Sequence, residues 1–230
     1  VSLTDFDWVW LRLPRPIAET FFPYLLQLIP EQQIFNQPTG ILETSNKAFL
    51  LQLPEWCPEM RLCRSFEEIE AFQKECDIVL KPLENYGGKG VLRIQKGWVS
   101  EGRNRIALQD YAPHFEEELK HGGYLGMRYL KNVRQGDKRI VVVNGQIIGA
   151  ALRIPARGSW LCNAAQGGAS HFALPDEREE EMAEAISRLL LPKGIVMFGL
   201  DTLVDDDGKR VLSEINTLSI GGIKQMAAHA

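Results

Sequence analysis

The amino-acid sequence predicts an α+β fold in which helices pack on largely antiparallel sheets. Two hairpin signals carry most of this prediction. An Asn-Gly pair in VNGQ separates the apolar runs KRIVV and IIGAALRI, and a DDDG turn separates GIVMFGLDTLV from KRVLSEIN. An Asn-Gly pair between apolar runs is the strongest short hairpin signal. Because hairpins alternate with helices, and crossover helices do not separate the strands regularly, the pattern favours α+β over a doubly wound parallel sheet.

The N-terminal quarter of the chain predicts short elements. Large apolar residues alternate over residues 6–13, which indicates a strand. Residues 17–29 predict a helix with Pro23 inside it or at its start. Residues 33–38 predict a short strand that ends before a proline, and residues 45–53 a short helix.

The next segment carries a clear helix start. Ser65 and Glu68 have the spacing of a capping box, which predicts a helix over residues 65–75. Apolar runs then predict strands at residues 77–83 and 90–95, on either side of a glycine-rich turn.

Two further helices are expected towards the C-terminus. Residues 176–191 are amphipathic and carry acidic residues in the first turn, where the helix dipole favours them. Residues 219–230 begin a last helix. The sequence contains no internal repeat and no low-complexity segment.

The composition is that of an ordinary globular protein. The 230 residues are 45% hydrophobic and 24% charged, with a formal net charge of −4. The chain has no excess of basic residues, so its charge gives no indication of a nucleic-acid partner. No apolar run is long enough to cross a membrane, and no signal peptide is recognisable. We therefore expect a cytoplasmic protein with four reduced cysteines, which are Cys57, Cys63, Cys76 and Cys162.

The hairpin at residues 194–216 is the best candidate for a metal site. Glu214 and Asn216 lie two residues apart on the returning strand and so share one face, and the hairpin brings Asp201 beside them. Two carboxylates and an amide oxygen are hard ligands that suit Mg²⁺. The alternative is a set of cross-strand polar residues that face water. The apolar flanks favour the metal site, because buried acids need partners.

Two weaker signals also point to anion binding. Asp137 and Arg139 share one strand face in GDKRIVVV, and Arg153 lies near the end of the partner strand. The two arginines could clamp an anion bidentately, or Asp137 could form a surface ion pair that contributes little. The small residues of segment 163–170 could let the backbone approach a ligand, or form only a flexible loop.

The glycine-rich turn in KPLENYGGKGVLRI is ambiguous by itself. It is not a Walker A loop, because Gly88-Lys89 is followed by glycine rather than by serine or threonine. As an isolated pattern it is typical of a tight hairpin. A phosphate-binding loop becomes the better interpretation only if other ligand-binding residues lie near it.

Taken in order, these segments resemble the ATP-grasp ligases, and most closely the prokaryotic glutathione synthetases. NQPTGILETSNK resembles the family segment N-x-P-x-x-[LI]-x-x-x-x-x-K, with Lys47 as the first phosphate-binding lysine. LKPLENYGGKGVLRI resembles LKPLDGxGGxxIxRV, with Lys81 as the second lysine and Gly87 and Gly88 in a lid over the phosphates.

The resemblance continues through the C-terminal half. YLKNVRQGDKRIVVVNGQ resembles the family's hinge and following hairpin. It implies that Met127, Arg128, Tyr129 and Leu130 lie against the adenine and that Asp137 lies in the nucleotide site.

Three further pairs of segments carry the implied catalytic, metal and substrate residues. LRIP and NAAQGG match the segments that hold the catalytic Arg153 and Asn163, which act with Arg139. FGLD and LSEIN match the metal hairpin of Asp201, Glu214 and Asn216. RLPRP and TLSIGG correspond to the substrate-binding segments. Their implied substrate-binding residues are Arg12, Ser219, Gly221 and Gly222.

The resemblance implies an ATP-dependent ligase that forms an amide through an acyl phosphate. Lys47 and Lys81 would neutralise phosphate oxygens, and Arg139 and Arg153 would hold the acyl phosphate and the oxyanion. The cofactors would be ATP and Mg²⁺, with Mn²⁺ as a substitute. An acidic peptide donor and an amino-acid acceptor are implied, with γ-glutamylcysteine and glycine as the first choice. Two alternatives remain, which are another ATP-grasp peptide or amino-acid ligase and a non-catalytic ATP-binding module.

The family pattern also implies the domain organisation. Residues 46–230 would form the ATP-grasp domain, with a small lobe over about 60–124 and a larger lobe over about 125–230. Residues 1–45 would be a remnant of the N-terminal α/β substrate domain, and the family organisation allows a homo-oligomer. Leu161 stands where the family usually has an arginine, and the RLPRP and TLSIGG segments also depart from the family pattern. These departures lie on the substrate side, whereas the ATP and metal residues match.

Overall fold

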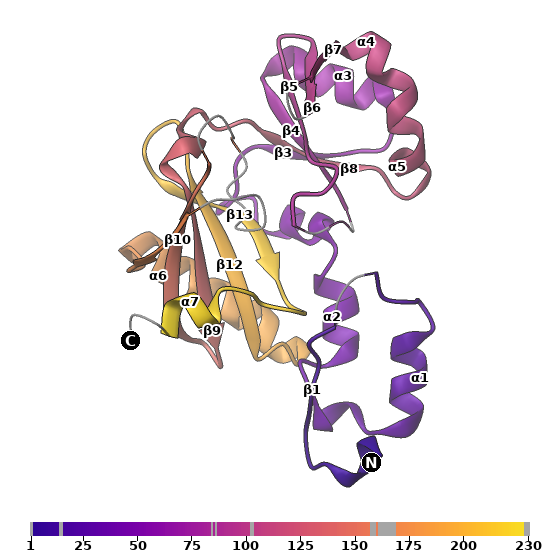
Figure 1. Cartoon of the computed structure of the whole chain (residues 1–230), viewed down its shortest axis with the longest axis vertical. Coiled ribbons are helices and arrows are strands. Elements are labelled where there is room, and N and C mark those ends of the chain that lie inside the picture. Colours follow the sequence, from indigo (N-terminus) through magenta and orange to yellow (C-terminus); the bar gives the residue numbers. More distant parts are fainter. Residues whose placement is uncertain are drawn as a thin grey trace.

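The computed structural model describes residues 2–13, 16–83, 85, 87–101, 104–156, 160 and 169–227. Figure 1 shows an N-terminal segment at the bottom and two lobes above it, each built on one sheet. One sheet has six strands and the other has five, and all the pairs within both are antiparallel. The α+β prediction is therefore confirmed.

The N-terminal segment contains short helices and one pair of very short strands. Its only strands, β1 (Val9–Trp10) and β2 (Ile34–Phe35), form a short parallel pair in the described part of the chain, so the strand expected over residues 6–13 pairs at two residues only. Helix α1 spans Phe21–Leu28, and Pro23 lies in its first turn, where no helical N–H is lost. Helix α2 (Pro38–Thr44) was not predicted, although Pro38 occupies the favourable first position.

The six-stranded sheet has the order β3-β8-β4-β5-β6-β7. Its strands are β3 (Met60–Cys63), β4 (Ile78–Pro82), β5 (Leu92–Gln95), β6 (Trp98–Glu101), β7 (Asn104–Ala107) and β8 (Tyr124–Arg128). Helices α3 (Phe66–Glu75), α4 (Leu108–Tyr111) and α5 (Glu116–Lys120) lie on one face (Figure 1). Because β8 fills the place between β3 and β4, this sheet continues to Arg128, past the limit of about 124 expected for the small lobe.

Ser65 caps α3 as expected, since its hydroxyl accepts the N–H of Glu68 at 3.3 Å. The reciprocal bond of a capping box shifts by one residue, because the Glu68 carboxylate accepts from the N–H of Arg64 at 2.6 Å. Buried Ile69 and Phe72 then pack α3 onto the sheet.

The five-stranded sheet has the order β11-β10-β9-β12-β13. Its strands are β9 (Asp137–Val143), β10 (Gln146–Ile154), β11 (Ala169–Ala173), β12 (Met197–Val204) and β13 (Arg210–Asn216). Both predicted hairpins are present. Asn144 and Gly145 form the first turn with positive φ angles of 48° and 79°, as the Asn-Gly signal requires.

Helices cover the two faces of this sheet differently. Helix α6 (Glu177–Leu190) buries Met182 and Ile186 in the main hydrophobic core, with Ile140 of β9. Helix α7 (Ile223–Ala227) places Met226 against Val141, on the opposite face. Because side chains alternate along β9, Asp137 and Arg139 share the face of Val141, and Lys138 faces α6.

The pairing of β12 with β13 contains a β-bulge. Asp201 lies opposite Glu214, but the next residue of β12, Thr202, lies opposite Leu212, so Ser213 is an extra residue. The Ser213 hydroxyl donates to the backbone oxygen of Asp201 at 3.0 Å. This bulge lies at the edge of the cleft described below.

The predicted boundary between residues 45 and 46 remains a prediction, and the core crosses it. One hydrophobic cluster contains Phe22 and Ile41 from the N-terminal segment together with Phe198 and Leu200 from β12. In the described residues, no helix is both long enough and apolar enough to cross a membrane.

Candidate active site

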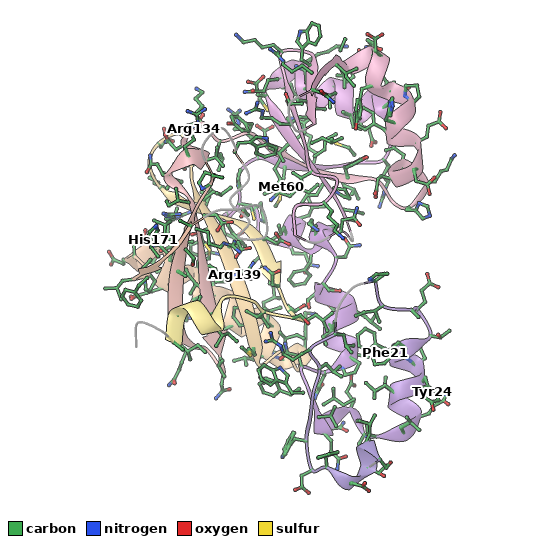
Figure 2. The ribbon with its side chains drawn as sticks, in the orientation of Figure 1. Phe21, Tyr24, Met60, Arg134, Arg139 and His171 are labelled. Atoms are coloured by element: carbon green, nitrogen blue, oxygen red, sulfur yellow. The ribbon has the colours of Figure 1, made fainter. Side chains whose placement is uncertain are left out.

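A cleft lies between the two sheets and contains about 850 Å³ of space not filled by protein atoms. Figure 2 labels Arg139 on the five-stranded sheet and Met60, at the start of β3, on the other side. Many of the predicted nucleotide and metal residues line the cleft. These are Lys47, Lys81, Gly87, Gly88, Met127, Arg128, Tyr129, Leu130, Asp137, Asp201 and Glu214.

One end of the cleft is apolar. Val79 and Met127 approach it from the six-stranded sheet, and Leu203 approaches it from β12. Leu130 and Val133 complete this end, and both are buried. An apolar surface contributed by two sheets can hold an aromatic base.

The other end of the cleft carries two lysines. The Lys47 ammonium donates to the backbone oxygen of Asn85, and the Lys81 ammonium donates to that of Ser213 at 2.8 Å. The β-bulge explains the second contact, because the extra residue of a bulge has a carbonyl outside the strand ladder. Burial lowers the pKa of Lys81, while the carboxylates of Glu214 and Asp201 oppose that shift. The positive end of the cleft is therefore suited to phosphate oxygens.

The glycine-rich turn lies at this same end. Gly87, Gly88 and Gly90 have φ angles of 67°, 77° and 70°, values that residues with a Cβ rarely adopt. A Cβ on Gly90 would also lie 2.9 Å from Cγ of Pro82. The turn is thus both a tight connection between strands and a wall of the cleft.

Asp137, Arg139, Arg153 and Asp201 form a buried ion-pair network. Arg139 binds Asp201 through two nitrogens, and its Nη2 lies 2.6 Å from Oδ2. Arg153 binds Asp137 at 2.5 and 2.6 Å and reaches Asp201 at 3.0 Å. Asp137 does pair with an arginine, as one alternative from the sequence had it, but the pair is buried rather than on the surface. Strand pairing places these residues opposite one another inside the protein.

The two carboxylates of this network have different electrostatics. Burial raises the pKa of Asp137 to about 6, and the nearby Asp201 adds to the shift while Arg153 opposes it. Burial alone would also raise the pKa of Asp201, but Arg139 and Arg153 together lower it well below the usual range. Asp201 therefore stays ionised.

The proposed metal ligands lie around Asp201. Glu214 is its cross-strand partner, and Nδ2 of Asn216 lies 3.4 Å from its Oδ2. No group of three or more His, Cys, Asp or Glu side chains suited to a metal occurs in the described residues, so the site depends on two carboxylates and one amide. Such an oxygen set fits a hard divalent cation that takes its remaining ligands from water and phosphate. Among described groups, none hydrogen-bonds to the Glu214 carboxylate, which leaves it available to such an ion.

The predicted substrate residues lie behind Arg139 rather than in the cleft lining. Arg12 donates to the backbone oxygen of Ile220 at 3.0 Å, and the Ser219 hydroxyl donates to that of Leu13 at 2.9 Å. Nη1 of Arg139 lies 3.4 Å from the backbone oxygen of Gly221, and Gly222 is close to the same side chain. The structure thus places Gly221 and Gly222 beside Arg139, and it connects the segments that carry Arg12 and Ser219 by two hydrogen bonds. Asn163 and Leu161 lie outside the described residues.

Several residues in or beside the cleft were not predicted as part of the site, and three of them contact predicted residues. Ser213 supplies the carbonyl for Lys81, and Trp160 lines the cleft near Tyr129, with ring centroids 6.2 Å apart. The Arg93 guanidinium lies 5.3 Å from the Tyr129 ring and 5.6 Å from that of Trp160. Alternation along VLRI indicates that Arg93 lies on the opposite face of the strand from Leu92 and Ile94. This pattern could have identified Arg93 from the sequence.

Two antiparallel α+β lobes that enclose a cleft with two lysines, a glycine-rich turn and acidic strand residues define an ATP-grasp protein. Solved structures agree on the fold. D-alanine–D-alanine ligase from Bacillus anthracis, complexed with ATP, matches with a TM-score of 0.65 at 16% identity, over 98% of this chain and 74% of that one. D-cycloserine synthetase DcsG matches with a TM-score of 0.68 at 14% identity, over 87% and 70%.

Sequence comparison gives the family. Residues 46–230 match the model of the prokaryotic glutathione synthetase ATP-grasp domain. A glutathione synthetase of Brucella melitensis is 31% identical over 98% of this chain and 69% of its own length. The chain belongs to the prokaryotic glutathione synthetase family, as its motifs predicted, and is an ATP-dependent ligase that forms C–N bonds. Ligases of this fold use ATP with a divalent metal ion.

Proposed function

We propose that this chain joins γ-glutamylcysteine to glycine in a reaction driven by Mg-ATP. The observation that carries the proposal is that Lys47, Lys81, Asp201 and Glu214 all line one cleft. Cations and carboxylates so placed can hold the phosphates and the metal of one nucleotide.

The residues of the cleft have distinct roles in this proposal. The apolar end holds the adenine between Val79 and Leu203, with residues 127–130 along its edge. Lys47 and Lys81 leave their backbone carbonyls and bind phosphate oxygens. Gly87 and Gly88 allow the turn to lie close to the phosphates, because no side chain intervenes.

Asp201, Glu214 and Asn216 would hold Mg²⁺, or Mn²⁺ in its place. The ion would supply positive charge to the β- and γ-phosphates, where negative charge has to be neutralised for transfer. Asp201 suits this role because its pKa is lowered and it remains a carboxylate.

In the first chemical step an oxygen of the donor carboxylate bonds to the γ-phosphorus, and the bond to ADP breaks. In the second step the amine nitrogen of the acceptor bonds to the acyl carbon and loses a proton, and phosphate leaves with the electron pair of the broken C–O bond. Arg139 and Arg153 would stabilise the negative charge of both steps, with Asn163 as a further donor. Arg12, Ser219, Gly221 and Gly222 would bind the donor peptide next to Arg139.

We place this reaction in the cytoplasm. Cys57, Cys63 and Cys76 are all free thiols, as expected in a reducing compartment. The proposed partners are small molecules only, an acidic peptide and an amino acid.

ADP release tests the proposal. The protein should form ADP from Mg-ATP when γ-glutamylcysteine and glycine are both present, and little ADP when either is omitted. A panel of other dipeptides and amino acids should give slower release. ADP formation with a different pair only would indicate another ligase activity. Thermal stabilisation by ATP without turnover of any pair would indicate a non-catalytic module.

A further inference from the structure

The face of the five-stranded sheet opposite the cleft contains a second buried ionic network. Its centre is Glu179, at the third position of α6, whose side chain is completely buried. The carboxylate accepts from Lys138 Nζ at 2.5 Å and from the Thr202 hydroxyl at 2.5 Å. It also accepts the N–H of Asp176 at 2.9 Å, and Nε of Arg210 lies 3.8 Å away.

The partners of Glu179 come from three adjacent strands. Lys138 lies on β9, Thr202 on β12 and Arg210 on β13. These three strands carry the candidate catalytic and metal residues on their other face. One helical side chain therefore connects the three strands directly behind the site.

The residues bound by Glu179 lie at the same level along β9 and β12 as the candidate active-site residues. Lys138 and Thr202 are cross-strand partners, and the next pair in the register is Arg139 and Asp201. Successive residues of a strand point to opposite faces. The Glu179 network and the Arg139–Asp201 ion pair thus lie back to back on neighbouring pairs.

Simple packing does not account for this network. Apolar residues of similar volume would be as stabilising as a buried ion pair, or more so, because charged groups lose their hydration. Most of the surrounding face, including Ile140, Leu200 and Met182, is apolar and fully buried. The charged network occurs where the position of the strands matters for the opposite face.

We propose that Glu179 is a positioning residue for the ligase reaction, since it fixes β9, β12 and β13 relative to one another. It thereby sets the spacing of Arg139, Asp201 and Glu214 around the metal and phosphates. This inference rests on the proposed nucleotide and metal site, and does not depend on the identity of the peptide substrate.

The test compares two substitutions on α6. Glu179→Gln removes the charge and keeps the shape, whereas Ile186→Ala, on the same buried face, lowers stability without touching the network. The Kd for ATP is measured by calorimetry with Mg²⁺ and with EDTA. The gain in affinity due to Mg²⁺ should fall about tenfold or more in Glu179→Gln and stay within about twofold in Ile186→Ala, as expected for a small displacement of positioned groups.

A second variant keeps the inference testable if Glu179→Gln does not fold. Thr202→Val removes one hydrogen bond from the network and is nearly isosteric, and its Mg²⁺-dependent gain should fall about threefold. Turnover should follow the same order, with a lower kcat and a raised KM for ATP in Glu179→Gln and neither changed greatly in Ile186→Ala. Equal Mg²⁺-dependent gains in Glu179→Gln, Thr202→Val and Ile186→Ala would overturn the inference. Absence of ADP release by the wild-type protein would instead count against the proposed substrates, since the binding comparison requires no peptide.

Discussion

The side chain of Asn36 pairs with the backbone of Met197 as a neighbouring strand would. Its Oδ1 accepts the N–H of Met197 at 2.9 Å, and its Nδ2 donates to the oxygen of the same residue at 2.5 Å. Two more bonds, from the N–H of Val196 and to the oxygen of Thr217, use the remaining capacity of the amide. This one buried side chain attaches the N-terminal segment to the start of β12, the strand that carries Asp201.

Asn36→Ala should lower the free energy of unfolding by about 3 kcal/mol, because buried backbone groups of Met197 and Thr217 lose their partners. Urea unfolding measures the change. Asn46→Ala is a suitable control, because it removes a single capping bond to Ala48, and should lower stability by only about 1 kcal/mol. Equal losses in the two variants would contradict the role given to Asn36.

Lys81→Met should make the nucleotide-free protein slightly more stable and weaken ATP binding. Burial lowers the pKa of Lys81, which means that the folded protein holds its charge unfavourably. An apolar chain of similar length should therefore stabilise the protein by about 1 kcal/mol. ATP affinity, measured by calorimetry, should fall about tenfold or more, because a charge on the phosphates is lost. Lys89→Met, at an exposed position of the glycine-rich turn, should change neither quantity greatly.

The effect of Lys81→Met on stability should also depend on pH. Because the folded-state pKa of Lys81 lies below 10.5, the unfolded chain binds more protons between the two pKa values. Wild-type stability therefore rises with pH through this window, and the advantage of the variant shrinks. Urea unfolding of both proteins at increasing pH measures the difference, which should be largest below the folded-state pKa. A difference that does not change with pH would contradict the lowered pKa.

Glu214→Gln and Asp201→Asn should both weaken metal binding, but only Asp201→Asn should also lower the free energy of unfolding substantially. Glu214→Gln should change the free energy of unfolding by less than about 0.5 kcal/mol and reduce the Mg²⁺-dependent thermal stabilisation by ATP. Asp201→Asn should reduce the same stabilisation and also destabilise the protein by about 3 kcal/mol, because Arg139 and Arg153 lose their carboxylate. An unchanged Mg²⁺-dependent shift in both variants would refute the metal assignment.

Gly90→Ala should destabilise the protein more than Gly87→Ala does. Both glycines have positive φ, which costs an alanine about 1 kcal/mol. Only at Gly90 would the added Cβ also meet Pro82, whereas at Gly87 nothing lies within 4 Å. Thermal unfolding without nucleotide measures both. Equal destabilisation would show that the turn can shift away from Pro82.

Local signals in the sequence were sufficient for several elements. The hairpin at Asn144–Gly145 and the start of α3 at Ser65 depend on neighbouring residues, and both are where they were predicted. The position of β8 between β3 and β4 depends on pairing between residues that lie roughly 40 to 70 positions apart, which no local pattern encodes. The shared face of Asp137 and Arg139 follows from alternation, but their burial with Arg153 and Asp201 depends on how β9 pairs with its neighbours. The bulge at Ser213 was missed for the same reason, since a bulge is a property of two paired strands.

Ser213 can be regarded as an insertion that the fold does not require. Without it, Glu214 and Leu212 would be consecutive and would still face Asp201 and Thr202, so the two strands would form a regular ladder. What a chain one residue shorter would lack is the carbonyl on which the Lys81 ammonium rests. Insertion or deletion of a single codon could therefore add or remove the carbonyl group that binds the Lys81 ammonium, while the two strands remain paired.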